Sequence, residues 1–380
     1  MKKIFLLILA VVLLFSSCNF NNSQKDKTED TAKFIGVWFT YEEIKELSEK
    51  SNSAEQLEDN IKNIFAELQK YNVNNIFLHV RAFDDCFYKS KLFQVSEYCK
   101  NEKGELKFDI LDCFIKLSQD YNISIHAWLN PYRIRNDNKT DKISPNSFAG
   151  KILSENIKDE RIIVTDNSIY YNPAYPDVQN YVLSCIRELV EKYKIDGIHI
   201  DDYFYPTTDP KIDEIIYKKY IDNGGTLSNA DFRRNAVNSL VSSMYSLVKH
   251  HDSEILVSIS PSADIEKNYN NSYADIKLWA ESRGYADILI PQIYYGFEHS
   301  TMPFNDLLNK WMSLQNEKTK IVVGLAVYKC NKIDVYAGQG KEEWKENHNV
   351  IMRQIVTINN WNFYGWSFFS TSYLLKNQNF

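Results

Sequence analysis

Two adjacent aspartates, Asp201 and Asp202, end a short apolar run in the stretch IDGIHIDDYFYP (195–206). Side chains of a β-strand alternate between its faces, so Asp201 shares a face with Gly197 and His199, whereas Asp202 begins on the other face. Hydrolysis of a glycosidic bond needs carboxyl groups that protonate the leaving oxygen and attack or activate water. We therefore predict that Asp201 points into a site and is its first catalytic carboxylate.

The sequence leaves the second carboxyl group open. Asp202 qualifies if the chain turns where the strand ends, but it could instead hold the loop through backbone hydrogen bonds. Asp85 and Asp264 each lie on a loop after another apolar run. A substrate with N-acetyl groups could also use its own acetamide as the nucleophile, while Asp201 and Asp202 orient and protonate. The carboxyl that acts as the acid needs a raised pKa, which burial or a neighbouring carboxylate supplies.

Polar and aromatic residues gather at the ends of the other apolar runs, where they could bind a sugar. Flat aromatic rings could stack on sugar rings or simply pack in the core. Arg81 and Arg133 could bind a sugar carboxylate or lactyl group, or pair with loop acids. The predicted substrate-binding residues are Trp38, His79, Arg81, Trp128, Asn130, Arg133, His199, Tyr203, Tyr205, Gln292, Tyr294 and Tyr295.

Three histidines raise a different chemistry. His79, His126 and His199 lie on neighbouring apolar runs and could all point inward, and three imidazoles can hold Zn²⁺ with one position open. Such a site would indicate a metal-dependent polysaccharide deacetylase. The chain has no HxH or HExxH spacing, and inward histidines often hydrogen bond to their neighbours. We therefore expect no metal and no cofactor.

Eight apolar runs of strand length, alternating with amphipathic segments, must position these residues. Near-continuous apolar runs fit strands that are buried on both faces, as in parallel sheets. The predicted strands are 34–40, 74–81, 123–130, 195–202, 255–261, 286–295, 320–328 and 363–370. The predicted helices are 54–72, 109–121, 176–194, 230–249, 273–282, 304–315 and 342–360.

This alternation predicts an α/β fold, a (β/α)8 TIM barrel that forms a single domain over 34–380. The alternative, an open doubly wound sheet, is disfavoured because no strand is followed by a GxGxxG or P-loop motif. Active sites of such barrels lie at the carboxyl ends of the strands, where the residues above fall. The long segment 131–175 is predicted as a loop insertion on that side.

The N-terminus resembles an export signal. Two lysines, an apolar run and two serines precede Cys18, which predicts a signal peptide over 1–17. Cys18 after small residues is typical of a bacterial lipobox, with Phe15 where that motif usually has Leu. We expect lipidation of Cys18, a flexible tether over 18–33, and a membrane-anchored lipoprotein outside the cytoplasm, at the cell surface or in the periplasm. An ordinary signal peptide or membrane anchor is the alternative.

Composition excludes some partners. The 380 residues carry a net charge of −6 and show no basic stripe, so nucleic acid is not expected as a partner. Five cysteines follow Cys18 without a CxxC pattern, which disfavours a thiolate zinc site. A Cys86–Cys99 bridge is conceivable in an exported protein. The alternative is that the cysteines are free, with Cys113 and Cys185 buried on apolar helix faces.

Several stretches, in order and at barrel spacing, resemble the glycosyl hydrolase-like 10 family over about 34–370. The specific ones are HAWLNPYR and DGIHIDDYFYP, supported by FLHVRAFDDCFY and YYNPAYPDVQNYV and, more weakly, by GVWFT, VSISP and PQIYY. Ala82 and Asp84 depart from the residues expected there. The chain ends soon after the eighth strand, so no accessory sugar-binding module is expected. The motif matches are His79, Arg81, Asp85, Trp128, Asn130, Asp201, Asp202, Tyr203, Gln292 and Tyr294.

The resemblance implies an exported bacterial protein that cleaves glycans of the cell envelope, including peptidoglycan strands stripped of their peptides. We therefore expect a glycoside hydrolase that uses carboxylate acid/base catalysis on a polysaccharide substrate. A surface lipoprotein that binds glycan without cutting it would carry the same aromatic cleft. Formation of new reducing ends distinguishes the two.

Overall fold

The computed structural model describes residues 33–377. The predicted signal peptide, the Cys18 lipidation site and nearly all of the predicted tether lie outside the described residues. Among the helices that are described, none combines the length and the apolar character that a membrane crossing requires.

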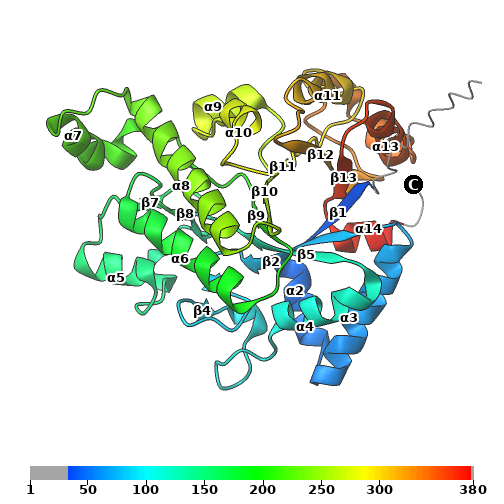
Figure 1. Cartoon of the computed structure of the whole chain (residues 1–380), viewed down its shortest axis with the longest axis horizontal. Helices are drawn as coiled ribbons and strands as arrows, with labels where there is room; N and C mark the ends of the chain where they lie inside the picture. The colour runs from blue at the N-terminus through cyan, green and yellow to red at the C-terminus, as the bar shows by residue number, and fades with distance from the viewer. Residues whose placement is uncertain (1–32, 378–380) are drawn as a thin grey trace, which may run out of the picture. The chain divides into compact units, whose positions relative to one another are not determined.

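Eight parallel strands close into a barrel inside a ring of helices (Figure 1). The order around the barrel follows the order along the chain, and the last strand pairs with the first. The predicted (β/α)8 TIM barrel is thereby confirmed. The barrel strands are β1 (Phe34–Phe39), β2 (Asn75–Arg81), β5 (Ser124–Leu129), β9 (Gly197–Ile200), β10 (Leu256–Ile259), β11 (Ile288–Leu289), β12 (Lys320–Leu325) and β13 (Gly365–Phe368).

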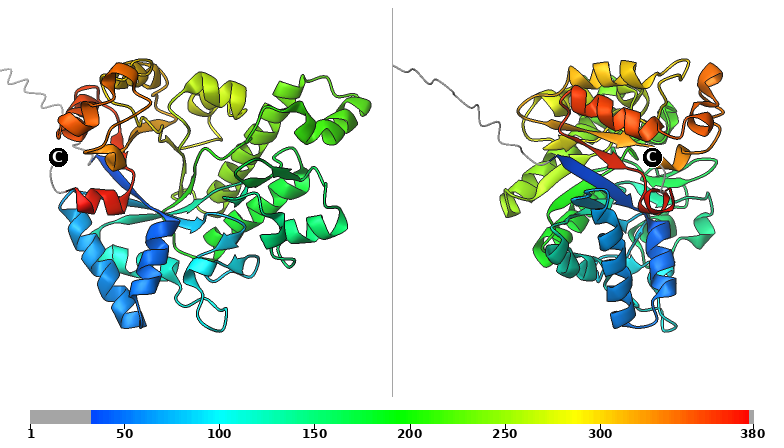
Figure 2. Two further views of the ribbon diagram at one scale, coloured as in Figure 1. Left: turned by 180° about the vertical axis from the view of Figure 1, so that it is seen from behind. Right: turned by 90° about the vertical axis from the view of Figure 1, so that its right-hand side faces the viewer.

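Amphipathic helices cover the outside of the barrel, as the further views in Figure 2 also show. Each buries an apolar stripe against the strands, and Pro176 begins one of them, where its missing N–H costs nothing. The helices at or near predicted positions are α3 (Ala54–Gln69), α4 (Ile110–Ser118), α6 (Pro176–Lys192), α8 (Asn229–His251), α10 (Ile276–Glu281), α11 (Phe304–Met312) and α13 (Val350–Asn360).

The structure adds short elements that the sequence pattern did not predict. The additional helices are α2 (Tyr41–Lys50), α5 (Phe148–Glu155), α7 (Glu214–Asp222), α9 (Ile265–Asn271) and α14 (Thr371–Lys376), and the predicted helix 342–360 divides into α12 (Glu343–Glu346) and α13. The predicted strand 286–295 shortens to β11, because Pro291 follows it and lacks the N–H that a parallel ladder needs.

The insertion 131–175 has secondary structure of its own. Its three short strands form an antiparallel sheet in the order β6 (Arg133–Arg135), β8 (Ile169–Tyr171), β7 (Ile162–Val164). The loop after β2 adds the pair β3 (Asp85–Cys86) and β4 (Gln94–Val95). These small sheets give fixed positions to residues that the sequence assigned to loops.

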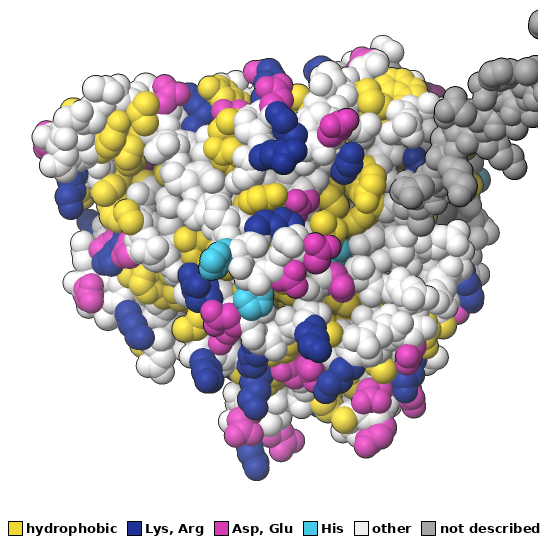
Figure 3. All heavy atoms as spheres, in the orientation of Figure 1, with side chains coloured by type: hydrophobic (Ala, Val, Ile, Leu, Met, Phe, Trp, Pro, Cys, Tyr) yellow, Lys and Arg dark blue, Asp and Glu magenta, His cyan; other side chains and the backbone are white. Residues whose placement is uncertain are grey.

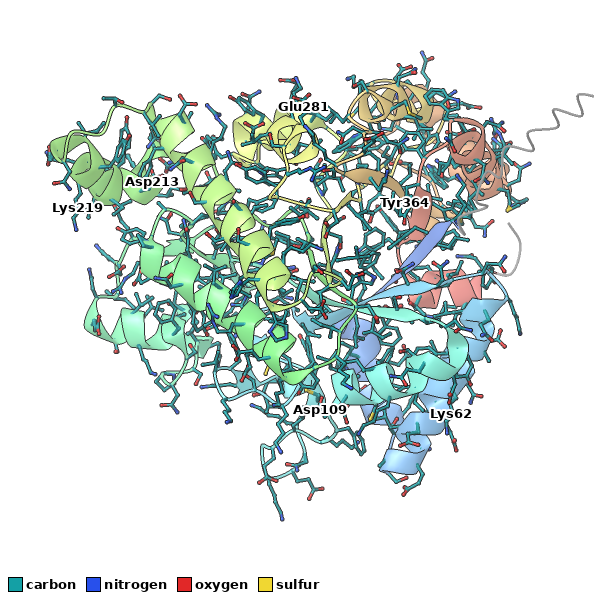
Figure 4. The ribbon with its side chains drawn as sticks, viewed as in Figure 1. Lys62, Asp109, Asp213, Lys219, Glu281 and Tyr364 are labelled. Carbon is teal, nitrogen blue, oxygen red and sulfur yellow. The ribbon has the colours of Figure 1, made fainter. Side chains whose placement is uncertain are left out.

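A buried ion pair fixes the segment that follows β9. Arg233 of α8 contacts both carboxylate oxygens of Asp213 at 2.7 Å, and both side chains are fully buried. Asp213 lies beside the start of α7, close to α8 (Figure 4). The same guanidinium donates to the backbone oxygens of Thr208 and Asp209. The pair therefore holds the chain between Asp202 and α7 against the barrel.

Charged side chains are spread over the surface. On the face in Figure 3, acidic and basic side chains are interspersed and no continuous basic stripe is seen. This face therefore lacks the clustered basic side chains by which proteins bind nucleic acid.

Inside the barrel, β9 and β5 approach each other closely at one glycine. The ring of His126 on β5 lies against Gly197, and a Cβ atom added at Gly197 would meet His126 Nδ1 at 2.0 Å. His126 Nε2 in turn contacts Asn75 Oδ1 of β2 at 2.9 Å, so the ring has little freedom to move away. Glycine at 197 is therefore required by the packing of three adjacent strands.

We predict that Gly197→Ala lowers the free energy of unfolding by about 3 kcal/mol or prevents folding, because a side chain is forced into a filled core. Urea unfolding followed by circular dichroism measures this change. Gly104→Ala is the matched control, since Gly104 has φ +79° but open space around it, and should cost only about 1 kcal/mol. Equal losses in the two variants would contradict the steric explanation.

Candidate active site

A cavity of about 570 Å³ opens at the carboxyl ends of the barrel strands. Its volume lies within the range of about 300–1,000 Å³ that is common for small-molecule sites. The predicted site residues that line it are Trp38, His79, Trp128, Asn130, Arg133, Asp201, Asp202, Tyr203, Gln292 and Tyr294. Side chains from widely separated parts of the chain thus meet in one hollow.

Asp201 is a desolvated carboxyl group within this cavity. It is 4% exposed, and Trp128 Nε1 donates a hydrogen bond of 3.2 Å to its Oδ2 atom. Its Oδ1 atom has no hydrogen-bond partner among the described residues. Burial, and then the charge of Asp202, raises the pKa of Asp201 well above its usual range, while Arg133 opposes this shift. A protonated carboxyl with one free oxygen is suited to give a proton to a substrate atom.

Asp202 lines the same cavity although a continuing strand would turn it to the opposite face. The strand ends at Ile200, and the backbone N–H of Phe204 donates to the Asp202 carbonyl at 2.9 Å, which marks a tight turn. Burial raises the pKa of Asp202, and the Gln292 side chain opposes this by hydrogen bonding to the carboxylate. Asp201 and Asp202 are therefore two consecutive carboxyl groups that line one cavity and are both desolvated.

A chain of hydrogen bonds lies under the cavity. Trp38 Nε1 donates to His199 Nε2 at 3.0 Å, and His199 Nδ1 lies 2.8 Å from Ser258 Oγ. Burial holds the pKa of His199 well below its usual range, so the ring is neutral. Because an indole N–H can only donate, Nε2 accepts and the single ring proton is on Nδ1, which donates to Ser258. His199 thus supports the wall residue Trp38 from below and does not itself line the cavity.

Two predicted aromatic residues of the cavity lining, Trp128 and Tyr294, are held by different ring contacts. Trp128 stacks on His79 with ring centroids 3.7 Å apart and an interplanar angle of 11°. Tyr294 packs edge-on against Tyr328, with centroids 5.9 Å apart. Burial lowers the pKa of His79 well below its usual value, so the stacked imidazole is neutral. Both walls present ring faces or edges to the cavity and could contact a sugar ring.

Arg133 is a cation of the cavity lining whose charge lowers the pKa of both aspartates. Its guanidinium carbon lies 4.6 Å from the centroid of the Tyr203 ring and 5.0 Å from that of Phe83. Its Nε atom is buried and has no hydrogen-bond partner among the described residues. A guanidinium held between two rings keeps its charge and its donors available for an anionic or hydroxyl group.

Several predicted site residues lie away from this cavity. Arg81 is fully buried, donates to the backbone oxygen of Asn130 at 2.6 Å and lies 3.5 Å from Asp84, so it makes the loop contacts that were the alternative to sugar binding. Tyr205 packs against Tyr273 and the buried Arg233. The others outside the cavity lining are His199, Tyr295 and Asp264.

Asp85 and Asp264, two of the residues considered as the second catalytic carboxylate, do not line this cavity. Asp264 is the N-cap of α9, where its Oδ1 accepts from the Lys267 backbone N–H at 3.1 Å. Asp85 lies in β3 and lines a separate cavity beside the first. Burial raises the pKa of Asp85 to about 6. The structure therefore brings Asp202, and neither of these two, next to Asp201.

Sequence reasoning missed a group of cavity residues on α2 and α14. Glu43 is the most prominent: it is buried, and its carboxylate accepts from the backbone N–H groups of Thr40 and Ser372 and from Ser370 Oγ. The T-x-x-E spacing of Thr40 and Glu43 is a capping box, a signal that could have revealed α2. The other missed lining residues are Tyr41, Glu42, Glu46, Phe369, Ser372, Tyr373 and Lys376.

The positions of the histidine, cysteine and acidic side chains bear on the alternatives of a metal site and a disulfide. Within residues 33–377, no three or more His, Cys, Asp or Glu side chains gather as a metal site would require. Of the two possibilities for the cysteines, the structure has the free thiols: Cys86 and Cys99 form no bridge, and both are buried. Burial raises the pKa of the Cys99 thiol to about 12, so it is a poor nucleophile near neutral pH.

Two curated relatives are similar to this chain. Glycosyl hydrolase DigH of Escherichia coli (strain K12) is 29% identical over 289 residues, which cover 70% of this chain and 64% of that protein. Glycosyl hydrolase YngK of Bacillus subtilis (strain 168) is 30% identical over 302 residues, covering 73% and 57%. The match thus spans less than two thirds of the length of either relative.

Solved structures share the fold at low sequence identity. The glycoside hydrolase domain of PgaB (BpsB) from Bordetella bronchiseptica is similar with a TM-score of 0.56 and 9% identity, over 91% of this chain and 96% of that one. The catalytic domain of beta-amylase from Paenibacillus polymyxa gives a TM-score of 0.56 and 9% identity, over 91% and 95%. These structures show that the barrel is of the type found in glycosidases.

The family is shown by a direct match over most of the chain. The model of the Glycosyl hydrolase-like 10 family matches residues 33–339, which include Asp201, Asp202 and most of the cavity lining. The chain therefore belongs to the Glycosyl hydrolase-like 10 family.

Proposed function

We propose that this protein is a glycoside hydrolase that cleaves the glycan strands of bacterial peptidoglycan, with Asp201 as the general acid. The observation that carries the proposal is the state of Asp201: it is buried, it is hydrogen bonded by Trp128, and it lies next to a second carboxyl group whose charge raises its pKa. Such a group remains protonated at a pH where an exposed aspartate would be ionised.

The proposed reaction uses the cavity residues as follows. A glycan enters with a glycosidic oxygen near the Asp201 carboxyl group, which gives its proton to that oxygen as the bond to the anomeric carbon breaks. The carbon is then attacked by a nucleophile on its other side, and water completes the hydrolysis. If the sugar carries an N-acetyl group, its acetamide oxygen is the nucleophile and Asp202 orients it. Otherwise Asp202 activates the water.

The substrate class follows from the lining. Aromatic faces from Trp38, Trp128 and Tyr203 suit sugar rings, and the guanidinium of Arg133 suits the lactyl carboxylate that distinguishes one of the two peptidoglycan sugars. The resemblance of the chain to exported proteins of the same family supports this substrate further. A glycan-binding lipoprotein without activity remains the competing function, because the same aromatic cleft would serve it.

The proposal includes export and anchoring. A lipid on Cys18 would hold the barrel at the outer face of a membrane, close to the cell wall. The segment before the barrel, 18–33, is long enough to separate the two, since an extended chain spans about 3.3 Å or more per residue.

We predict that Asp201→Asn lowers kcat by about 10²–10⁴-fold, because the proton donor is removed while the shape of the site is kept. New reducing ends released from peptide-free glycan strands measure the activity. Binding of the strands by the parent protein without any product, unchanged in Asp201→Asn, would favour the glycan-binding alternative.

The same variant has an expected effect on stability. The folded-state pKa of Asp201 is raised above its unfolded value, so the parent loses stability as the pH rises from the unfolded pKa through the folded one. Because an asparagine side chain does not ionise, Asp201→Asn does not lose stability in this way as the pH rises. Its thermal midpoint should therefore be at least as high as that of the parent at pH 8, and a clearly lower midpoint there would contradict the raised pKa.

We predict opposite shifts in the pH dependence of activity for two substitutions around Asp201. Asp202 raises the pKa of Asp201 and Arg133 lowers it. The alkaline limb of residual kcat/KM should therefore move to lower pH in Asp202→Asn and to higher pH in Arg133→Gln. Carbon-13 NMR titration of the Asp201 carboxyl gives the same pKa independently of turnover. Shifts of the same sign in both variants would remove Asp201 as the group that controls this limb.

We predict that Cys18→Ala abolishes palmitate labelling of the protein and moves it from the membrane fraction to the soluble fraction of its host. Cys330→Ala, which alters a partly buried thiol of the barrel, is the matched control and should leave both properties unchanged. Retention of the label in Cys18→Ala would show that Cys18 is not the lipidated residue.

A further inference from the structure

A second cavity, of about 240 Å³, lies beside the first and has less than half its volume. It is formed by the loop after β2, which includes β3 and β4, and by the insertion after β5, which includes β6. Nothing in the reaction proposed above uses it. Its lining includes the aromatic residues Phe83 and Tyr98, the acidic residues Asp84, Asp85 and Glu97, and the basic residues Lys100, Arg135 and Lys142.

Three stacked or edge-packed rings connect the two cavities. Tyr41 lines the first cavity, whereas Phe83 and Tyr98 line the second. The Tyr41 ring contacts both, with centroid distances of 5.2 Å to Phe83 and 5.7 Å to Tyr98. Arg133 also spans the boundary, because it lines the first cavity and lies 5.0 Å from the Phe83 ring. The two cavities are therefore neighbours that share one aromatic wall.

The second cavity contains hydrogen-bond acceptors that the protein leaves unused. Asp85 Oδ1 and Asp84 Oδ2 are buried and have no hydrogen-bond partner among the described residues. The Asp84 side chain is only 7% exposed, and its other oxygen accepts from Tyr181 at 2.9 Å. A buried acceptor without a donor destabilises a fold, so two unpartnered acceptors on side chains that line one cavity point to a ligand that donates.

The chemistry of the lining favours a sugar over a metal ion. Aromatic faces together with a few placed acceptors are the usual composition of a site for a ring-shaped neutral ligand with hydroxyl groups. A divalent cation would need several oxygen ligands around one point, and within residues 33–377 no group of three or more acidic, His or Cys side chains forms such a centre. The hydroxyl groups of a sugar can donate to both free carboxylate oxygens.

We propose that the second cavity binds one sugar unit of the polysaccharide whose cleaved bond lies at Asp201, as a distal subsite. Asp85 and Asp84 accept hydrogen bonds from its hydroxyl groups, and Tyr98 supplies a ring face. A glycan strand would then run from the barrel mouth past Tyr41 and Arg133 into the β3–β4 loop. This inference rests on the proposed function, because it takes the same glycan strand as its ligand.

The test is the dependence of affinity on chain length. Calorimetric titrations use the full chain carrying Asp201→Asn, so that the ligand is not cut, and peptide-free peptidoglycan oligosaccharides from the disaccharide to the octasaccharide. Affinity should rise with length up to the oligosaccharide that reaches the second cavity. Adding Asp85→Asn should weaken binding of the long oligosaccharides by about tenfold and that of the disaccharide by less than twofold.

Two further variants keep the result interpretable. Asn136→Trp fills the same cavity from an exposed position and should reproduce the length-dependent loss even if Asp85→Asn folds poorly. Asp120→Asn changes an exposed aspartate just after α4 that lines neither cavity; it is the matched control and should bind like the parent. Thermal midpoints of all variants identify any that are unfolded.

Each outcome has a definite meaning. Losses that are equal at every chain length, or absent in both Asp85→Asn and Asn136→Trp, would overturn the subsite and leave the proposed function standing. An Asp201→Asn protein that binds none of the oligosaccharides would overturn the proposed substrate, and the subsite with it.

Discussion

The free-energy cost of holding the Asp201 carboxyl group out of water is the constraint on which the site depends. An exposed aspartate would be ionised near neutral pH and could not donate a proton. Closure of eight strands into a barrel excludes water below the side chain, and Trp38 and Trp128 cover it at the mouth. The raised pKa of Asp201 is thus a property of the whole fold, since no single neighbouring residue could supply the same desolvation.

Rigidity of the surrounding side chains follows from the same requirement. Trp128 can donate to Asp201 only if its ring is fixed, and the parallel ring of His79 at 3.7 Å fixes it. Trp38 is fixed in a similar way by His199, whose tautomer is set by Ser258. The role of His79 and His199 inside the barrel is therefore to orient the indole rings of Trp128 and Trp38. This explains why inward histidines, which first indicated a zinc site, are hydrogen bonded to their neighbours here.

The fold could be predicted from the sequence because buried parallel strands and amphipathic helices leave strong periodic signals, as in β9 and α6. The site was only partly predictable. The pleat of β9 predicted the inward position of Asp201 but not the turn at Ile200 that brings Asp202 into the same cavity. Arg81 and Asp85 were assigned to the site, yet Arg81 is buried against the backbone of Asn130 and Asp85 lines the second cavity. Glu43 was missed because α2 is short and follows β1 directly, although its capping box was visible.

The order of the two carboxyl groups along the chain limits the mechanism. Consecutive residues have Cα atoms about 3.8 Å apart, so the side chains of Asp201 and Asp202 start from neighbouring points of the cavity wall. Glu43 could approach from across the cavity, but its carboxylate already accepts from Thr40, Ser370 and Ser372 and is committed to holding α14 against α2. The two other carboxylates of the lining, Glu42 and Glu46, are exposed and hydrogen bonded by Tyr41 and Lys50, so within residues 33–377 the lining offers no further buried carboxylate that is free of hydrogen bonds. This arrangement favours attack by the substrate's own acetamide, with Asp201 protonating the leaving oxygen and Asp202 orienting the acetamide.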